Sequence, residues 1–215
     1  MRAIEPLKHA QNDSDIHVVM AANGALLELD QSNTINELIC KFNDVNTQRF
    51  DLFVIAVNLK DITEKIGTNY VKNISNLCVS ILKGNDPIRF TAICEGNRIG
   101  AISKHHALKE ERILFIKLLI SALNHKEYKI RSSAADALGE ILRDDLNIEQ
   151  RDVIINKLIS MIDDDIFDVR RSTIISLCQY IKDPRAIEPL QKAADKGGDD
   201  RDMILRQLDN LKQAT

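Results

Sequence analysis

The feature that most constrains this 215-residue sequence is a six-residue segment that occurs twice. Arg2–Leu7 and Arg185–Leu190 both read Arg-Ala-Ile-Glu-Pro-Leu, although they lie near opposite ends of the chain. Weaker copies between them share a leucine that is followed about eleven residues later by an aliphatic residue, an arginine or both. The anchoring leucines are Leu7, Leu38, Leu77, Leu119, Leu158 and Leu190, which are spaced by 31, 39, 42, 39 and 32 residues. Repeats of this length indicate stacked copies of one supersecondary unit.

Each unit has the pattern of two α-helices joined by a short turn. Apolar residues of the first helix recur three, four and seven positions apart, as in the segment from Val153 to Ile162. An acidic turn such as Asp163–Asp165 follows, and its carboxylates are suited to capping the next helix. Small residues such as Ser132–Ala135 then allow the second helix to approach a neighbour closely. One pair cannot bury its apolar face alone, so the sequence predicts an all-α stack.

We therefore expect a single domain over residues 1–215 with about six helical hairpins. Their approximate bounds are 2–28, 32–60, 62–100, 108–143, 147–181 and 185–213. No segment has the pattern of a strand. Because aromatic residues make up only 4% of the chain and tryptophan is absent, aliphatic side chains must build the core.

Composition excludes several classes of protein. The net charge of −3 lacks the basic footprint that nucleic-acid backbones demand, which argues against DNA or RNA as a partner. No secretory signal and no apolar run of about 20 residues is visible, so we expect no membrane partner. The four cysteines form no C-x-x-C motif, which favours reduced, mostly buried thiols and a cytoplasmic location.

Two segments carry a family resemblance. Lys129–Gly139 and Asp168–Ser172 resemble the second helix of HEAT repeats, and Asp183–Leu190 is similar to the HEAT-like subtype of phycobiliprotein lyases. The resemblance implies a curved, right-handed α-solenoid whose second helices line the concave side. It is broken at Gln48, which replaces an aliphatic residue, and at Glu95-Gly96, which occupies core-type positions. We expect irregular packing or an unusual surface in those two units.

An arginine recurs at the start of several second helices. The series is Arg49, Arg89, Arg131 and Arg170. One interpretation is a ladder that binds an acidic partner or a carboxylate ligand. The interpretation that we favour is a structural brace, in which each guanidinium pairs with the acidic turn and nearby carbonyl groups.

No motif for catalysis or metal binding is present. The chain contains no His-Glu, H-x-x-x-H, G-x-S-x-G, G-x-x-x-x-G-K-[ST] or G-x-G-x-x-G pattern, so we assign no catalytic residue, no metal ligand and no cofactor. The main polar candidates outside the helices are Lys104, His105 and His106, in the long connection 101–108. The acidic runs Asp144-Asp145 and Asp163–Asp165 are interpreted as helix caps rather than as cation sites.

Two functions remain open at this point. The first is a non-enzymatic scaffold that binds a protein on its concave face. Its candidate contacts are Asn23, Glu95, Arg98, Asp136 and Glu140, with Lys104, His105 and His106 in the neighbouring loop. The alternative, implied by the lyase resemblance, is a bilin lyase or chromophore-handling protein that acts with a second subunit and takes a bilin as substrate, using His105, His106 or an arginine. The amino-terminal hairpin has little polar cap, which indicates either a dimer contact there or a missing preceding segment.

Overall fold

A computed structural model describes residues 3–44, 46–47, 52, 55, 68–94, 109–143 and 148–214. Helices account for the regular structure of these ranges, and no strand occurs in them, which confirms the all-α expectation. The chain divides into two compact units, Met1–Glu111 and Arg112–Thr215. The single domain and the six hairpin bounds stay predictions, and the hairpins expected at 32–60 and 62–100 lie partly outside the described residues.

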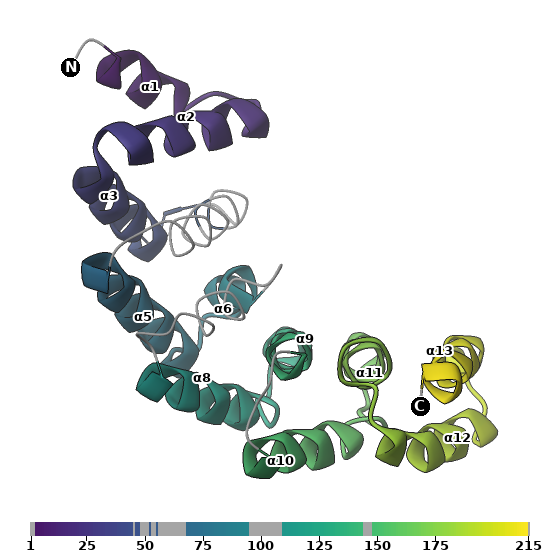
Figure 1. Cartoon of the computed structure of the whole chain (residues 1–215). Coiled ribbons are helices and arrows are strands. Elements are labelled where there is room, and N and C mark those ends of the chain that lie inside the picture. The colour runs from purple at the N-terminus through teal and green to yellow at the C-terminus, as the bar shows by residue number, and fades with distance from the viewer. Residues whose placement is uncertain are drawn as a thin grey trace. The chain divides into compact units, whose positions relative to one another are not determined.

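The first unit is a chain of helices that each pack on the next. They are α1 (Ile4–Ala10), α2 (Ile16–Leu29), α3 (Gln31–Asn43), α5 (Thr68–Lys83) and α6 (Pro87–Cys94), as Figure 1 shows. Helix α2 begins where the carboxylate of Asp15 accepts a hydrogen bond of 2.8 Å from the backbone N–H of His17. Apolar side chains such as Leu26, Phe42 and Phe90 are fully buried in this unit.

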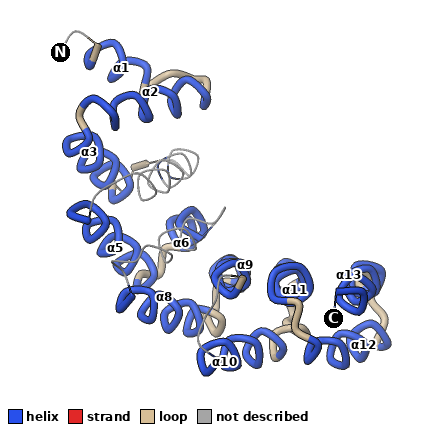
Figure 2. Tube along the Cα trace, in the orientation of Figure 1, coloured by secondary structure: helices blue, strands red, loops and turns tan. Residues whose placement is uncertain are grey.

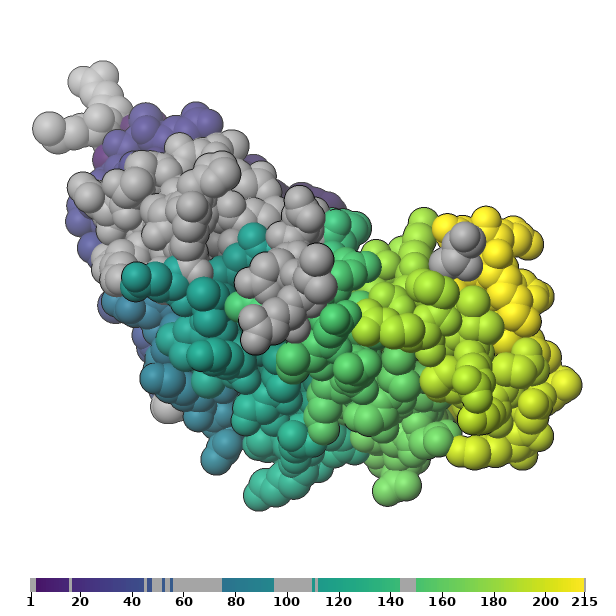
Figure 3. Space-filling model, turned by 60° about the horizontal axis from the view of Figure 1, so that its bottom comes forward, coloured from purple at the N-terminus to yellow at the C-terminus, as the bar shows by residue number. Residues whose placement is uncertain are grey.

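The second unit has two layers of helices. Helices α9 (Tyr128–Leu142), α11 (Phe167–Ile175) and α13 (Arg201–Ala214) lie side by side in one layer, and α10 (Ile148–Ile159) and α12 (Ile187–Asp195) form the other (Figure 1). Helix α8 (Lys109–Ala122) precedes α9, and a π-helical segment, η3 (Ser176–Ile181), continues α11. The spaces between these ribbons are filled by side chains, as the face drawn in Figure 3 shows.

Specific residues end the elements of the second unit (Figure 2). Lys182 has a φ of 52° and terminates η3. Asp183 then caps the short 3-10 helix η4 (Pro184–Ala186) by accepting a hydrogen bond of 3.0 Å from the N–H of Arg185. Gly197 and Gly198, with φ angles of 76° and 111°, reverse the chain between α12 and α13. In the described part of the chain, no helix is long and apolar enough to span a bilayer.

Candidate functional site

Two arginines tie together the turns of the second unit. Arg131 donates two parallel hydrogen bonds of 2.9 Å to the carboxylate of Asp164, while its Nη1 donates to the carbonyl oxygen of His125 at 2.8 Å. Arg170 repeats the arrangement, with Nε at 2.5 Å from Asp200 Oδ2 and Nη1 at 2.7 Å from the carbonyl oxygen of Asp164. Each guanidinium thus joins the carbonyl of its own turn to the carboxylate of the next turn. Such charge-assisted contacts fix the geometry of the turns.

The environment of Asp164 favours its charged form. Burial acts to raise the pKa of this carboxyl, but hydrogen bonds from the Arg131 guanidinium and from the Ile166 N–H outweigh burial. The pKa of Asp164 is therefore lowered, and the group stays ionised where it braces the turn.

Arg89 in the first unit instead binds backbone carbonyl groups that lie earlier in the sequence. Its Nε donates to the carbonyl oxygen of Phe42 at 2.9 Å, its Nη2 donates to that of Asp44 at 2.5 Å, and its Nη1 pairs with Asp86. The contact therefore ties the start of α6 to the end of α3. The remaining arginine of the series, Arg49, lies outside the described residues.

Small polar residues hold α9 against α11 and η3. The hydroxyl oxygens of Ser132 and Ser172 are 2.8 Å apart, and Ser172 donates to Asp136 Oδ2 at 2.9 Å. Ser176 donates to the carbonyl oxygen of Ala135 at 2.9 Å. Gly139 faces Ser176 so closely that an added Cβ would lie 2.6 Å from the Cβ of Ser176. These residues let the two second helices approach closely, as the small residues of the sequence predict.

A polar strip lies beside this contact, and we define it as Asp136, Glu140, Arg143 and Tyr180. Asp136 and Glu140 come from α9 and are partly exposed, and Tyr180 comes from η3. Burial first, and then the carboxylates of Glu140 and Asp136, raise the pKa of Tyr180. The Arg143 guanidinium lies 6.0 Å from the centre of the Tyr180 ring. The strip therefore offers carboxylates, a guanidinium and a phenol within a small area.

Of the other predicted contact residues, the structure describes Asn23. It was expected to face outward, but it is only 3% exposed, and its side-chain oxygen accepts a hydrogen bond of 2.7 Å from Gln11 Nε2. Its outward placement is wrong, and the amide joins the end of α1 to α2. The residues outside the described ranges are Glu95, Arg98, Lys104, His105 and His106. Among the residues that the structure describes, no cluster of His, Cys, Asp or Glu could hold a metal ion.

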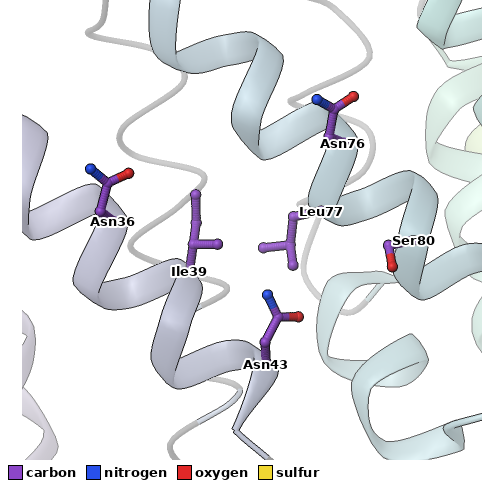
Figure 4. A pocket seen from close by; sticks show the side chains of 6 residues that line it. All are labelled: Asn36, Ile39, Asn43, Asn76, Leu77 and Ser80. Carbon is purple, nitrogen blue, oxygen red and sulfur yellow. The ribbon is translucent and has the colours of Figure 1, made fainter.

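A cleft of about 350 Å³ lies between α3 and α5 in the first unit. Figure 4 shows its lining, in which three asparagines and a serine surround two aliphatic side chains: Asn36, Ile39, Asn43, Asn76, Leu77 and Ser80. Sequence reasoning missed this feature. Asn36 and Asn43 are seven residues apart, and Asn76 and Ser80 are four apart, so helical spacing places each pair on one helix face.

The cysteines are structural in character. Cys78, Cys94 and Cys178 are buried, Cys40 is exposed, and all four are free thiols. Burial raises the pKa values of Cys78 and Cys178 to about 12, which keeps these two thiols protonated and unreactive. The expectation of mostly buried cysteines is confirmed, whereas their reduced state stays a prediction.

Comparison with known proteins supports a helical-repeat fold. Residues 116–208 match a family model described as HEAT repeats. No match was found among curated proteins. The HEAT resemblance of the second unit is thereby supported, whereas the lyase-like subtype stays a prediction.

Solved structures of helical-repeat proteins are similar over nearly the whole chain. An engineered protein is 18% identical, covers 99% of this chain and 100% of its own, and has a TM-score of 0.55. A protein from a study of microtubule plus end tracking by XMAP215, CLIP-170 and EB1 is 14% identical, with coverages of 97% and 89% and a TM-score of 0.57. A computationally designed armadillo repeat protein for modular peptide recognition is 14% identical, with coverages of 98% and 99% and a TM-score of 0.50. At such identities the likeness shows the fold alone, which is that of the α-solenoid class.

Proposed function

We propose that this protein is a non-enzymatic scaffold that binds a protein partner through the second-helix layer of residues 112–215. The observation that carries the proposal is the polar strip of Asp136, Glu140, Arg143 and Tyr180, placed on two helices that hydroxyl bridges hold together. A surface that is already rigid loses little conformational entropy when it binds. The designed armadillo protein with a similar fold is described as a protein for peptide recognition, which adds support.

The strip suits a helix or loop that carries both charge and hydrogen-bonding groups. The carboxylates of Asp136 and Glu140 would pair with basic side chains of the partner. The Tyr180 ring would supply contact area, and aromatic residues of this kind often dominate binding energies.

The test is the affinity of a partner recovered from the native cell by chemical cross-linking and then purified. We expect Glu140→Lys combined with Tyr180→Ala to weaken binding about tenfold or more. Glu188→Lys is the matched control, because Glu188 is exposed on α12 in the other layer. Equal affinities of all three proteins for the recovered partner would contradict the proposal.

We also propose a dimer through the amino-terminal hairpin. The identical six-residue segments support this, because they are buried to different extents. Ala186 and Leu190 are fully buried, whereas Ala3 is exposed, Leu7 is half-buried, and none of the α1 residues is buried. Val18 on α2 is also exposed.

The test of the dimer is light scattering after gel filtration. The wild type should give twice the monomer mass, and Val18→Glu should give the monomer mass. A wild-type monomer at high concentration would refute the contact.

The bilin alternative rests on the similarity of Asp183–Leu190 to lyases. It predicts a shift in the visible spectrum when the purified protein is mixed with a bilin, and an unchanged spectrum would dismiss it. A cytoplasmic location is likewise a proposal, supported by the four free thiols.

A further inference from the structure

The turn between α10 and α11 exposes two large apolar side chains in succession. Ile166 is 38% exposed and Phe167 is 44% exposed, and the flanking residues Asp165 and Asp168 are exposed as well. Within the described ranges, neither of these two aspartate side chains has an ion pair or hydrogen bond. Single apolar residues on a surface need no explanation, whereas exposed apolar surface that polar residues surround often marks an interaction site.

The backbone of this turn is held in place from both sides. Arg131 binds the Asp164 carboxylate, and Arg170 binds the Asp164 carbonyl oxygen. Asp164 Oδ1 also accepts a hydrogen bond of 3.0 Å from the N–H of Ile166. The Arg170 guanidinium lies 5.9 Å from the centre of the Phe167 ring. The tip is therefore ordered before any partner arrives, which lowers the entropic cost of binding.

The preceding turn of the same unit shows that the fold does not require Ile166 or the two aspartates. There His125 takes the place of Asp164: its Nδ1 accepts a hydrogen bond of 3.0 Å from the N–H of Glu127, and its carbonyl oxygen accepts one from Arg131. The next bond also recurs, at 3.1 Å in each turn, from Ile130 N to Glu127 O and from Val169 N to Ile166 O.

The two turns share this hydrogen-bond pattern but carry different tips. Counted from the shared bonds, Lys126, Glu127 and Lys129 stand where the later turn has Asp165, Ile166 and Asp168. An aromatic residue recurs at the remaining position, as Tyr128 and Phe167. A turn of this geometry is therefore built with lysines in place of both aspartates and with a glutamate in place of Ile166. Ile166 and the two aspartates of the later tip are left without a structural reason.

We propose that Asp165–Asp168 is a docking tip for a basic amphipathic segment of a partner protein. Apolar side chains of that segment would cover Ile166 and Phe167, and its Lys or Arg side chains would pair with Asp165 and Asp168. Charge complementarity selects this occupant, because the two unpaired carboxylates repel an acidic segment. The tip leads into α11, and Tyr180 of the polar strip lies twelve residues after Asp168. Asp136, at the other end of the strip, accepts a hydrogen bond from Ser172, which lies four residues after Asp168. The docking tip therefore adjoins one end of the polar strip, and the two surfaces are tested by substitutions at different residues.

The probe is a library of random 16-residue peptides displayed on phage and selected on the full-length protein. We expect enriched peptides to combine Lys or Arg with large apolar residues. Synthetic copies of these peptides should bind Ile166→Glu about tenfold more weakly than the wild type in fluorescence anisotropy. Asp165→Lys/Asp168→Lys should weaken binding most at low salt, where charge attraction is least screened.

The earlier turn supplies the matched control. Lys126→Asp/Lys129→Asp makes the opposite charge change on a turn with the same hydrogen bonds, and it should leave the affinity of the peptides unchanged. Because the substituted residues are those of the sibling turn, far-UV circular dichroism should match the wild type. If Ile166→Glu does not fold, the aspartate double variant still decides the question. Enrichment of acidic peptides, no enrichment, or affinities that do not depend on Ile166, Asp165 and Asp168 would overturn the proposal.

Discussion

Gly139 is the position where the close approach of α9 and η3 can be tested most directly. A Cβ built on Gly139 would lie 2.6 Å from the Cβ and 3.0 Å from the Cα of Ser176, and it would also meet the Ser176 hydroxyl oxygen. Overpacking of this kind costs about 1–3 kcal/mol. Displacing the Ser176 hydroxyl from the carbonyl of Ala135 costs about 1 kcal/mol more, while alanine regains about 1 kcal/mol of helix propensity. Gly139→Ala should therefore lower the free energy of unfolding by about 1–3 kcal/mol.

The assay is urea unfolding of the full-length protein, followed by circular dichroism. Gly24→Ala is the matched control, because Gly24 lies inside α2 and an added Cβ would meet nothing within 4 Å. That control should be more stable than the wild type by about 0.5–1 kcal/mol, from helix propensity alone. Ser176→Gly, introduced into Gly139→Ala, should recover part of the loss because it removes the clashing Cβ and hydroxyl. If Gly139→Ala stabilises the protein as Gly24→Ala does, the close packing of α9 on η3 is wrong.

Three further predictions concern the charged turns and the thiols. Arg131→Met should cost about 2–3 kcal/mol in urea unfolding, because the mostly buried Asp164 carboxylate loses its ion pair and keeps only the hydrogen bond from the N–H of Ile166. Glu188→Gln on the exposed α12 surface should leave the urea midpoint unchanged. The folded protein lowers the pKa values of Asp86, Asp164 and Asp183, so these ionised carboxylates stabilise it at pH values above the ordinary pKa of aspartate. The urea midpoint should therefore fall as the pH drops below about 4. A urea midpoint that stays constant from pH 6 to pH 2 would contradict this. A thiol reagent at pH 8 should label Cys40 quickly and the three buried cysteines only after unfolding, and Cys40→Ser should abolish the fast phase.

Local patterns in the sequence were enough to predict the all-α fold of the described ranges. Apolar spacing marks the helices, and acidic turns precede them, as the cap of α2 by Asp15 illustrates. The expected capping of α11 by Asp163–Asp165 is wrong, because the cap position is Ile166 and no side chain caps it. Asp164 instead accepts a hydrogen bond from the N–H of Ile166 within the turn. Small residues predicted the contact between α9 and α11, because two helices approach closely where small side chains such as Ser132 and Ser172 face each other. These features depend on residues within one turn or one helix, so the spacing of apolar and polar residues in the sequence predicts them directly.

Features that depend on contacts between helices were beyond the sequence. Asn23 was expected to face outward, but it is buried and accepts a hydrogen bond from Gln11 at the end of α1. The partner of Arg131 is the aspartate of the following turn, 33 residues away, and only stacking brings the two together. The cleft between α3 and α5 likewise depends on the distance between two helices, which the spacing of residues within one helix does not predict.

The two turns of the second unit share the arginine contacts that stabilise the fold but differ in the residues at their tips. Arg131 and Arg170 both bind a turn carbonyl and a carboxylate of the next turn, so the brace is repeated while the residues at the tips change sign and polarity. Substitutions at the brace therefore act on stability, and substitutions at the tips are free to act on binding. A repeat array built this way can acquire a new partner by changing Lys126–Lys129 or Asp165–Asp168 without weakening the contacts that hold neighbouring repeats together.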